Sequence, residues 1–257
     1  MLSRIEVPSS VRQGERLAAT AYWSTVATPS DDYVVEWQLE GADETIASTE
    51  PLAPGSSPTA WPPDVWIAGR TALSIPPTTT PGDYTLSLTL KDPADGTPVA
   101  TYTHPTPLEI REQDRVWEIP DMDQIVEVRF GDMIQLAGYD LTEGREKLQL
   151  TLYWEALRTP DRHYMFFVHL ADPQTGEPAS QVDTMPRGFT YPTGQWAPGE
   201  VVSDAVEIWT KDVAPGRYVL AVGWYDPDTK VRLPAVDAEG RRLSDDRLVL
   251  PISITVP

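Results

Sequence analysis

An internal repeat constrains this 257-residue sequence more than any other feature. The segment GERLAATAYWSTVATPSDDYVVEWQL (14–39) aligns with REKLQLTLYWEALRTPDRHYMFFVHL (145–170), which places Trp23 on Trp154 at an offset of 131 residues. Farther along, TPGDYTLSLTLKDPADGTPV (80–99) aligns with APGRYVLAVGWYDPDTKVRL (214–233) at an offset of 134 residues. Two copies of about 110 to 130 residues predict tandem domains that share one fold.

Within each copy, apolar residues alternate with polar ones, which is the period of a β-strand with one buried face. In RLAATAYW (16–23) and KLQLTLYW (147–154) this alternation ends on a tryptophan, and we expect Trp23 and Trp154 in the core. The segments KDPADGTP, ADPQTGEP and YDPDTKVR predict tight hairpins, because Asp-Pro favours a turn and the later glycine of the first two can adopt positive φ. The 26 prolines disfavour helices.

About seven short strands per copy, separated by turns, indicate an all-β chain of two tandem immunoglobulin-like β-sandwich domains. We expect the first domain at 1–113 and the second at 128–257. The intervening segment 114–127 begins polar and becomes apolar, which is typical of a linker or of an edge strand added to the second domain.

Composition excludes several classes of partner. The net charge of −19 is shared between residues 1–113, with 6 basic and 15 acidic residues, and residues 114–257, with 14 and 24. Such a field repels phosphate backbones and anionic lipids, so we expect no nucleic-acid partner. No apolar run approaches the ~18 residues that span a bilayer, so we expect no direct membrane insertion, and any leader or anchor would lie outside this sequence.

The sequence carries few signals for catalysis or metal binding. It has no cysteine, which excludes disulfides and zinc–thiolate sites. It has only three histidines. The pairs Asp121/Asp123 and Asp226/Asp228 could offer oxygens to calcium, but both lack the glycine and distal glutamate of an EF-hand loop, which favours linker and hairpin roles. We therefore expect no enzymatic activity, no catalytic residue, no cofactor and no bound metal.

The segment RGFTYPTGQWAPGEVVSD (187–204) is too rich in Pro and Gly for a regular strand, yet it holds three aromatic residues. In one interpretation its aromatic rings stack on sugars while polar side chains bind the hydroxyls. The candidate ligand-binding residues are then Arg187, Phe189, Tyr191, Gln195, Trp196 and Glu200. In the other interpretation Trp196 closes the end of the sandwich, which we favour because Trp61 recurs in the first copy in the similar SSPTAWPPDVW. Phe189 and Tyr191 have no such counterpart and remain the better candidates for a partner contact.

The second copy resembles a known family across roughly 133–256. Its Trp-containing strand, the pattern YPT..W.PGE and the pattern PG.Y.L.VG.YDP are similar to the soluble C-terminal region of large bacterial membrane glycosyltransferases, the family 39 or dolichyl-phosphate-mannose mannosyltransferase-like proteins. In that family the multi-span membrane domain carries the transferase chemistry. The resemblance implies an extracytoplasmic, non-catalytic appendage and supplies no active-site residue.

These observations predict a non-catalytic extracytoplasmic module of a membrane-anchored glycosyltransferase-like protein. The expected partners are a glycan or another cell-envelope polymer, and the membrane domain of the parent protein. One alternative is a purely structural spacer or oligomerisation module without a small ligand. The other is an enzyme with an unrecognised carboxylate pair, which would require two acidic residues in one cleft and a raised pKa on one of them.

Overall fold

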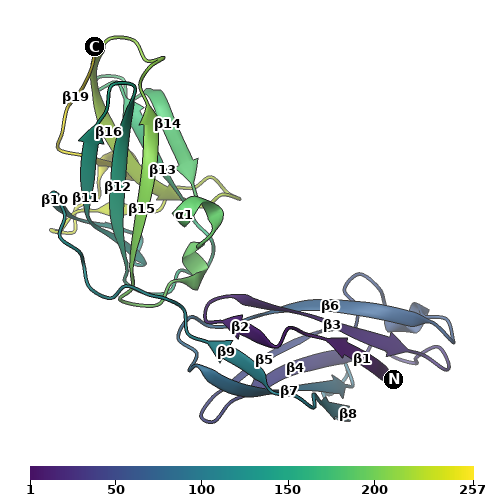
Figure 1. Cartoon of the computed structure of the whole chain (residues 1–257). Helices are drawn as coiled ribbons and strands as arrows, with labels where there is room; N and C mark the ends of the chain where they lie inside the picture. Colours follow the sequence, from purple (N-terminus) through teal and green to yellow (C-terminus); the bar gives the residue numbers. More distant parts are fainter. The chain divides into compact units, whose positions relative to one another are not determined.

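The computed structural model describes all 257 residues, which form two compact units, Met1–Gln113 and Asp114–Pro257. Both units are built almost entirely of β-strands, which confirms the all-β prediction (Figure 1). None of the helical elements has the length and hydropathy of a membrane-spanning helix.

Unit 1 is a sandwich of two sheets. Its strands are β1 (Leu2–Glu6), β2 (Ser10–Arg12), β3 (Arg16–Ser24), β4 (Val34–Glu40), β5 (Thr45–Pro51), β6 (Trp66–Ser74), β7 (Gly82–Lys91), β8 (Pro98–Thr103) and β9 (Leu108–Arg111), with the short 3-10 helix η1 (Pro58–Ala60). One sheet has the order β1-β3-β6, and the other has the order β2-β9-β7-β4-β5 with β8 also paired to β7.

Unit 2 follows the same plan with additions. Its strands are β10 (Gln124–Phe130), β11 (Ile134–Glu143), β12 (Lys147–Ala156), β13 (Met165–Ala171), β14 (Pro178–Thr184), β15 (Val201–Trp209), β16 (Gly216–Tyr225), β17 (Ala235–Val236), β18 (Leu248–Val249) and β19 (Ile254–Val256). The short helical elements are α1 (Pro186–Phe189), η2 (Thr193–Gln195) and η3 (Ser244–Asp246). The sheets have the orders β15-β12-β11-β10-β17 and β14-β13-β16-β18, and β19 pairs with β16.

Strands that align in sequence also pair alike in the two units. β3 pairs with β6 as β12 pairs with β15, and β4 lies between β5 and β7 as β13 lies between β14 and β16. The hairpins also agree, since the turns after β7 and β13 place Gly96 and Gly176 at positive φ. In the turn after β16 a lysine, Lys230, occupies the left-handed position with φ 61°.

Each unit has its own hydrophobic core between its sheets. The alternation in β3 and β12 places both strand tryptophans inside, where Trp23 is 4 % and Trp154 0 % exposed. In unit 2 the rings of Trp154 and Trp224 lie 4.9 Å apart and edge to face. Burial of such large rings between two sheets is the main stabilising contribution in a fold of this kind.

Candidate functional site

The 187–204 segment was the first candidate, and the structure uses most of its aromatic surface for the core. Trp196 is fully buried, its ring lies 5.9 Å from that of Trp224, and its indole N–H donates to the Tyr191 carbonyl oxygen at 3.2 Å. Trp61 in unit 1 is also buried. The ligand-stacking interpretation is therefore wrong for Trp196 in this conformation, and the closing role is the one observed.

Tyr191 and Glu200 are buried as well, in a polar cluster with Arg115. The Tyr191 hydroxyl donates to Glu200 Oε1 at 2.7 Å, and Arg115 Nη1 donates to the Tyr191 hydroxyl oxygen at 2.8 Å and to the Gln195 carbonyl oxygen at 3.0 Å. Arg115 and Glu200 also form an ion pair. Burial and the Glu200 hydrogen bond raise the pKa of Tyr191. These groups are occupied by one another, so the expected role of Tyr191 and Glu200 in hydrogen-bonding a ligand is not supported.

Arg115 is the residue that the sequence analysis missed. It stands in the segment predicted as a linker or edge strand, and its side chain is only 3 % exposed. Nothing local marks it, because its partners lie 76 to 85 residues farther along the chain. The pairing of Val116 with Val201 holds the same segment to the edge of β15.

Of the six predicted ligand-binding residues, Arg187 and Phe189 are exposed and Gln195 is half-buried. The Arg187 guanidinium lies 4.8 Å from the centre of the Tyr191 ring. Arg187, Gly188 and Phe189 all have positive φ, at 49°, 59° and 69°, so α1 is a left-handed turn. Phe189 is 59 % exposed at this turn. The six residues thus divide between core and surface and do not form one site.

The turn rests on a buried carboxylate. Asp204 occupies an inward-facing position of β15, between Val202 and Val206, and is 3 % exposed. The backbone N–H of Arg187 donates to Asp204 Oδ1, whereas Oδ2 is buried without a hydrogen-bond partner. Burial raises the pKa of Asp204 to about 6. Because the carboxylate faces the core, its unusual pKa affects stability and does not expose an acid to a substrate.

One member of each aspartate pair weighed for calcium makes another contact in the structure. Asp226 Oδ1 accepts the backbone N–H of Asp228 at 2.8 Å, and Oδ2 accepts from Arg162 at 2.8 Å. Asp226 thereby caps the turn after β16. The Asp123 backbone N–H donates to Asp140 Oδ1 at 2.7 Å, which fastens the segment before β10 to β11.

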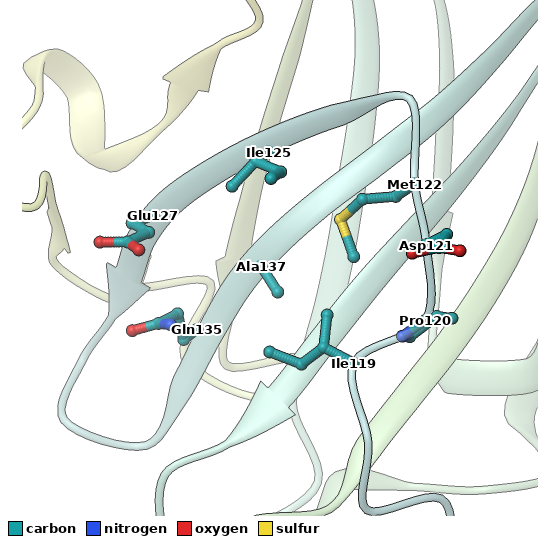
Figure 2. A pocket seen from close by; sticks show the side chains of 8 residues that line it. All are labelled: Ile119, Pro120, Asp121, Met122, Ile125, Glu127, Gln135 and Ala137. Atoms are coloured by element: carbon teal, nitrogen blue, oxygen red, sulfur yellow. The ribbon is translucent and has the colours of Figure 1, made fainter.

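A groove in unit 2 is the stronger candidate site. It has a volume of about 500 Å³ and lies between the outer face of β10 and β11 and the segment 119–122 that crosses them. Figure 2 shows the side chains that line it: Ile119, Pro120, Asp121 and Met122 from the crossing segment, Ile125 and Glu127 from β10, and Gln135 and Ala137 from β11.

Gly138 makes this crossing possible. A Cβ atom at residue 138 would lie 2.1 Å from Met122 Sδ and 2.2 Å from the Gln124 carbonyl oxygen, both far inside van der Waals contact. Only glycine allows the chain to pass so close to β11. The backbone of Gly138 therefore fixes where residues 122–124 lie and helps to shape the groove.

The groove combines an apolar floor with polar side chains. Isoleucine, proline, methionine and alanine supply the apolar surface, whereas Asp121, Glu127 and Gln135 supply hydrogen-bonding groups. Residues 116–125 also expose several large apolar side chains: Val116 at 49 %, Trp117 at 57 %, Ile119 at 51 % and Ile125 at 79 %. Exposed apolar residues clustered on one segment mark an interaction surface more often than isolated ones do.

Trp209 and Trp224 do not lie together on one exposed face of unit 2. Trp224 is fully buried, so it cannot share an outer face with Trp209, which is 49 % exposed. The ammonium groups of Lys147 and Lys211 lie 5.3 Å and 5.8 Å from the centre of the Trp209 ring. Trp66 in unit 1 is 67 % exposed.

Comparison with known proteins gives no functional assignment. No protein family matches the chain, and no curated protein sequence matches it. Among solved structures, the chain is similar to "Putative membrane anchored protein from Corynebacterium diphtheriae", at 14% sequence identity and a TM-score of 0.25. The match covers 98% of this chain, and the chain spans 60% of the length of that structure. Function therefore has to be inferred from the chain's own residues.

Proposed function

We propose that the chain is a non-catalytic, extracytoplasmic module of a membrane-anchored glycosyltransferase-like protein, and that unit 2 binds a neutral carbohydrate. The observation that carries the binding role is the groove on β10 and β11, which combines an apolar floor with acidic and amide side chains. Its volume of about 500 Å³ falls within the range of small-ligand sites, roughly 300–1,000 Å³. The link to glycosyltransferases rests on the sequence resemblance of the second copy.

The chemistry of the groove suits the two kinds of surface that a sugar offers. Ring C–H groups can pack on Ile119, Met122 and Ala137, while Asp121 and Glu127 can accept hydrogen bonds from hydroxyl groups. Gln135 can both donate and accept. A net charge of −19 disfavours uronic acids, teichoic acids and other anionic polymers, so the ligand we propose is uncharged.

Calorimetric titration of the full chain with neutral oligosaccharides tests this proposal. Gln135→Ala and Asp121→Ala should each weaken binding about three- to tenfold, the effect of losing one hydrogen bond. Gln149→Ala is the matched control, because Gln149 is exposed on β12 of the same sheet but does not line the groove. Equal affinity of Gln135→Ala, Asp121→Ala and Gln149→Ala would place any binding outside the groove.

A structural spacer is the second candidate, and the aromatic loop favours it. Trp196, Tyr191 and Glu200 contribute to the core of unit 2 and to its buried polar cluster, as a module built mainly for rigidity would require. This alternative predicts no saturable heat with any neutral oligosaccharide. It also predicts that Gln135→Ala, Asp121→Ala and Gln149→Ala behave alike in the titration.

A further inference from the structure

The outer face of the β1-β3-β6 sheet carries positive charge in an otherwise acidic unit. Residues 1–113 contain 15 acidic and only 6 basic residues. The three strands of this sheet contain one acidic residue and three arginines: Glu6, Arg4, Arg16 and Arg70. These side chains alternate with the inward-facing residues of the same strands, so they face away from the core. Half of the basic residues of unit 1 are therefore gathered on one face.

The corresponding face of unit 2 pairs its charges differently. There the exposed Glu207 of β15 forms an ion pair with Lys147 of β12. By the register of the aligned strands, Arg16 of β3 corresponds to Lys147, and Ala72 of β6 corresponds to Glu207. Unit 1 therefore has the cation without its carboxylate partner. In place of an ion pair, Arg16 Nη2 donates to the Ala72 carbonyl oxygen at 3.1 Å.

Arg70 is a second cation without a counter-ion. Its counterpart in unit 2 is Ala205, so the shared fold does not require a charged side chain at this position. Arg70 is exposed and forms no ion pair. It lies opposite Thr20 in the ladder of β3 and β6, and Thr20 lies opposite Glu6 in the ladder of β1 and β3. The Glu6 carboxylate pairs with Arg4, which leaves the charge of Arg70 unbalanced.

A groove of about 460 Å³ lies beside Arg70. It is formed by β3, β6 and the segment that follows β1, and its lining residues are Glu6, Val7, Pro8, Ala18, Ala19, Thr20, Arg70 and Thr71. The lining thus combines aliphatic side chains and threonine hydroxyl groups with one unpaired guanidinium. Such a combination suits a ligand that has an apolar part next to a carboxylate.

We propose that unit 1 binds the C-terminal end of a peptide from a partner protein, with the terminal carboxylate on Arg70 and the last side chain against Val7 and Ala18. A guanidinium offers a planar fork of N–H donors that matches the two oxygens of a carboxylate. Capture of a terminal carboxylate is a recurring mode of peptide recognition. This site is independent of the groove in unit 2.

The charge of the protein narrows the class of ligand. A net charge of −19 repels ligands that carry many negative charges. Charges more than about 8 Å away are largely screened at physiological ionic strength, so the unpaired Arg70 dominates inside the groove. A single carboxylate on an uncharged body is therefore attracted, whereas a polyanion is not. A peptide C-terminus supplies this one charge, and an apolar last residue matches the aliphatic lining.

Calorimetric titration of the full chain tests the proposal. The probes are N-acetylated tripeptides that end in valine, leucine or phenylalanine, each prepared as the free acid and as the C-terminal amide. At least one free acid should bind saturably. Its amide should bind about tenfold more weakly or worse, because it cannot accept a charge-assisted hydrogen bond from the guanidinium. Binding of the free acid should also weaken as salt is added.

Substitutions of Arg70 test the assigned contact. Arg70→Ala should weaken binding of the free acid about tenfold or more, and the variant should fold because Ala205 holds the equivalent place. Arg70→Lys should give an intermediate affinity, since lysine keeps the charge and loses the fork. Arg111→Ala is the matched control, because Arg111 is exposed on β9 of the other sheet, pairs with Glu109 and does not line the groove.

Four results would overturn the proposal. They are the absence of saturable binding by any free acid, equal affinity for acid and amide, and equal affinity of Arg70→Ala and the unmodified chain. The fourth is a single uronic acid that binds more tightly than every peptide and is lost in Arg70→Ala, which would assign the groove to an acidic sugar. Dimerisation of the chain alone that Arg70→Ala abolishes would also contradict it, because a second copy would then occupy this face.

Discussion

Arg115 and Glu200 form an ion pair inside unit 2, with side chains only 3 % and 1 % exposed. The pair joins the first residues of the unit to the loop before β15, and Tyr191 completes it by bonding to both partners. An ion pair so fully removed from water needs these additional hydrogen bonds to offset the cost of desolvation.

Removing the arginine should destabilise unit 2 strongly. Arg115→Met leaves the Glu200 carboxylate buried without its counter-ion, which costs about 3–5 kcal/mol in the free energy of unfolding. Denaturant unfolding followed by tryptophan fluorescence measures this loss. Lys147→Met is the control, because Lys147 pairs with Glu207 at the surface, where an ion pair contributes only about 0–1 kcal/mol. Equal effects of the two substitutions would contradict the buried network.

Asp204 should make the stability of unit 2 depend on pH. Its folded-state pKa of about 6 lies above the ordinary value of 3.8, so the protonated form is favoured by folding. The stabilising contribution of protonated Asp204 to the free energy of unfolding is therefore fully present below about pH 4 and is lost as the pH rises through 6. Asp204→Asn should raise the free energy of unfolding at pH 7 by about 1–3 kcal/mol, and this gain should vanish near pH 4.

The difference between the unfolding curves of Asp204→Asn and the unmodified chain isolates this residue from the other carboxylates. Glu207→Gln is a control of opposite sign, since Lys147 lowers the pKa of Glu207 and the substitution should bring no gain at pH 7. A gain from Asp204→Asn that stays constant between pH 4 and pH 7 would show that Asp204 titrates normally.

The three aligned hairpins predict an effect of backbone strain. Lys230 holds a left-handed conformation at which the other two turns have glycine, so Lys230→Gly should raise the melting temperature by relieving about 1 kcal/mol of strain. Gly96→Ala should lower the melting temperature, because φ at this position is 74°, which strains any residue other than glycine. An added Cβ would meet nothing within 4 Å, so this change tests backbone strain without a steric clash. A lower melting temperature for Lys230→Gly would mean that the contact of Lys230 with the Tyr225 ring outweighs the strain.

Gly138 should be essential for the shape of the groove. Gly138→Ala forces Met122 and the Gln124 backbone away from β11, which should cost about 1–3 kcal/mol of stability and abolish carbohydrate binding by unit 2. Gly216→Ala is the control, since its Cβ would lie at an ordinary 3.4 Å from the Tyr218 ring. Calorimetric titration of both variants measures the loss, and full binding by Gly138→Ala would separate the ligand from the groove.

Alternation in the sequence was sufficient to predict the strands and their inward faces. Trp23 and Trp154 are buried because a period of two places every second side chain between the sheets. The same alternation places Asp204 inward, although a carboxylate is normally read as a surface residue.

The polar cluster around Arg115 and the groove were harder to predict, because their residues are distant in the sequence or lie in irregular segments. Arg115 meets Glu200 across 85 residues, and no local pattern distinguishes a buried arginine from an exposed one. The groove arises where residues 119–122 cross β11 over Gly138, and the period of a strand does not encode that crossing. Tyr191 and Trp196 were candidate ligand-binding residues, because aromatic side chains in a Pro- and Gly-rich loop can face either the solvent or the core.

Methyl-resolved NMR of the full chain tests the carbohydrate-binding proposal most directly. With a saturating neutral oligosaccharide, we predict chemical-shift changes at the methyl groups of Ile119, Met122 and Ile125 and none at Ile208, which is buried in β15. Shifts confined to residues outside the groove, or no shifts with any neutral oligosaccharide, would contradict the proposed function and favour a structural spacer.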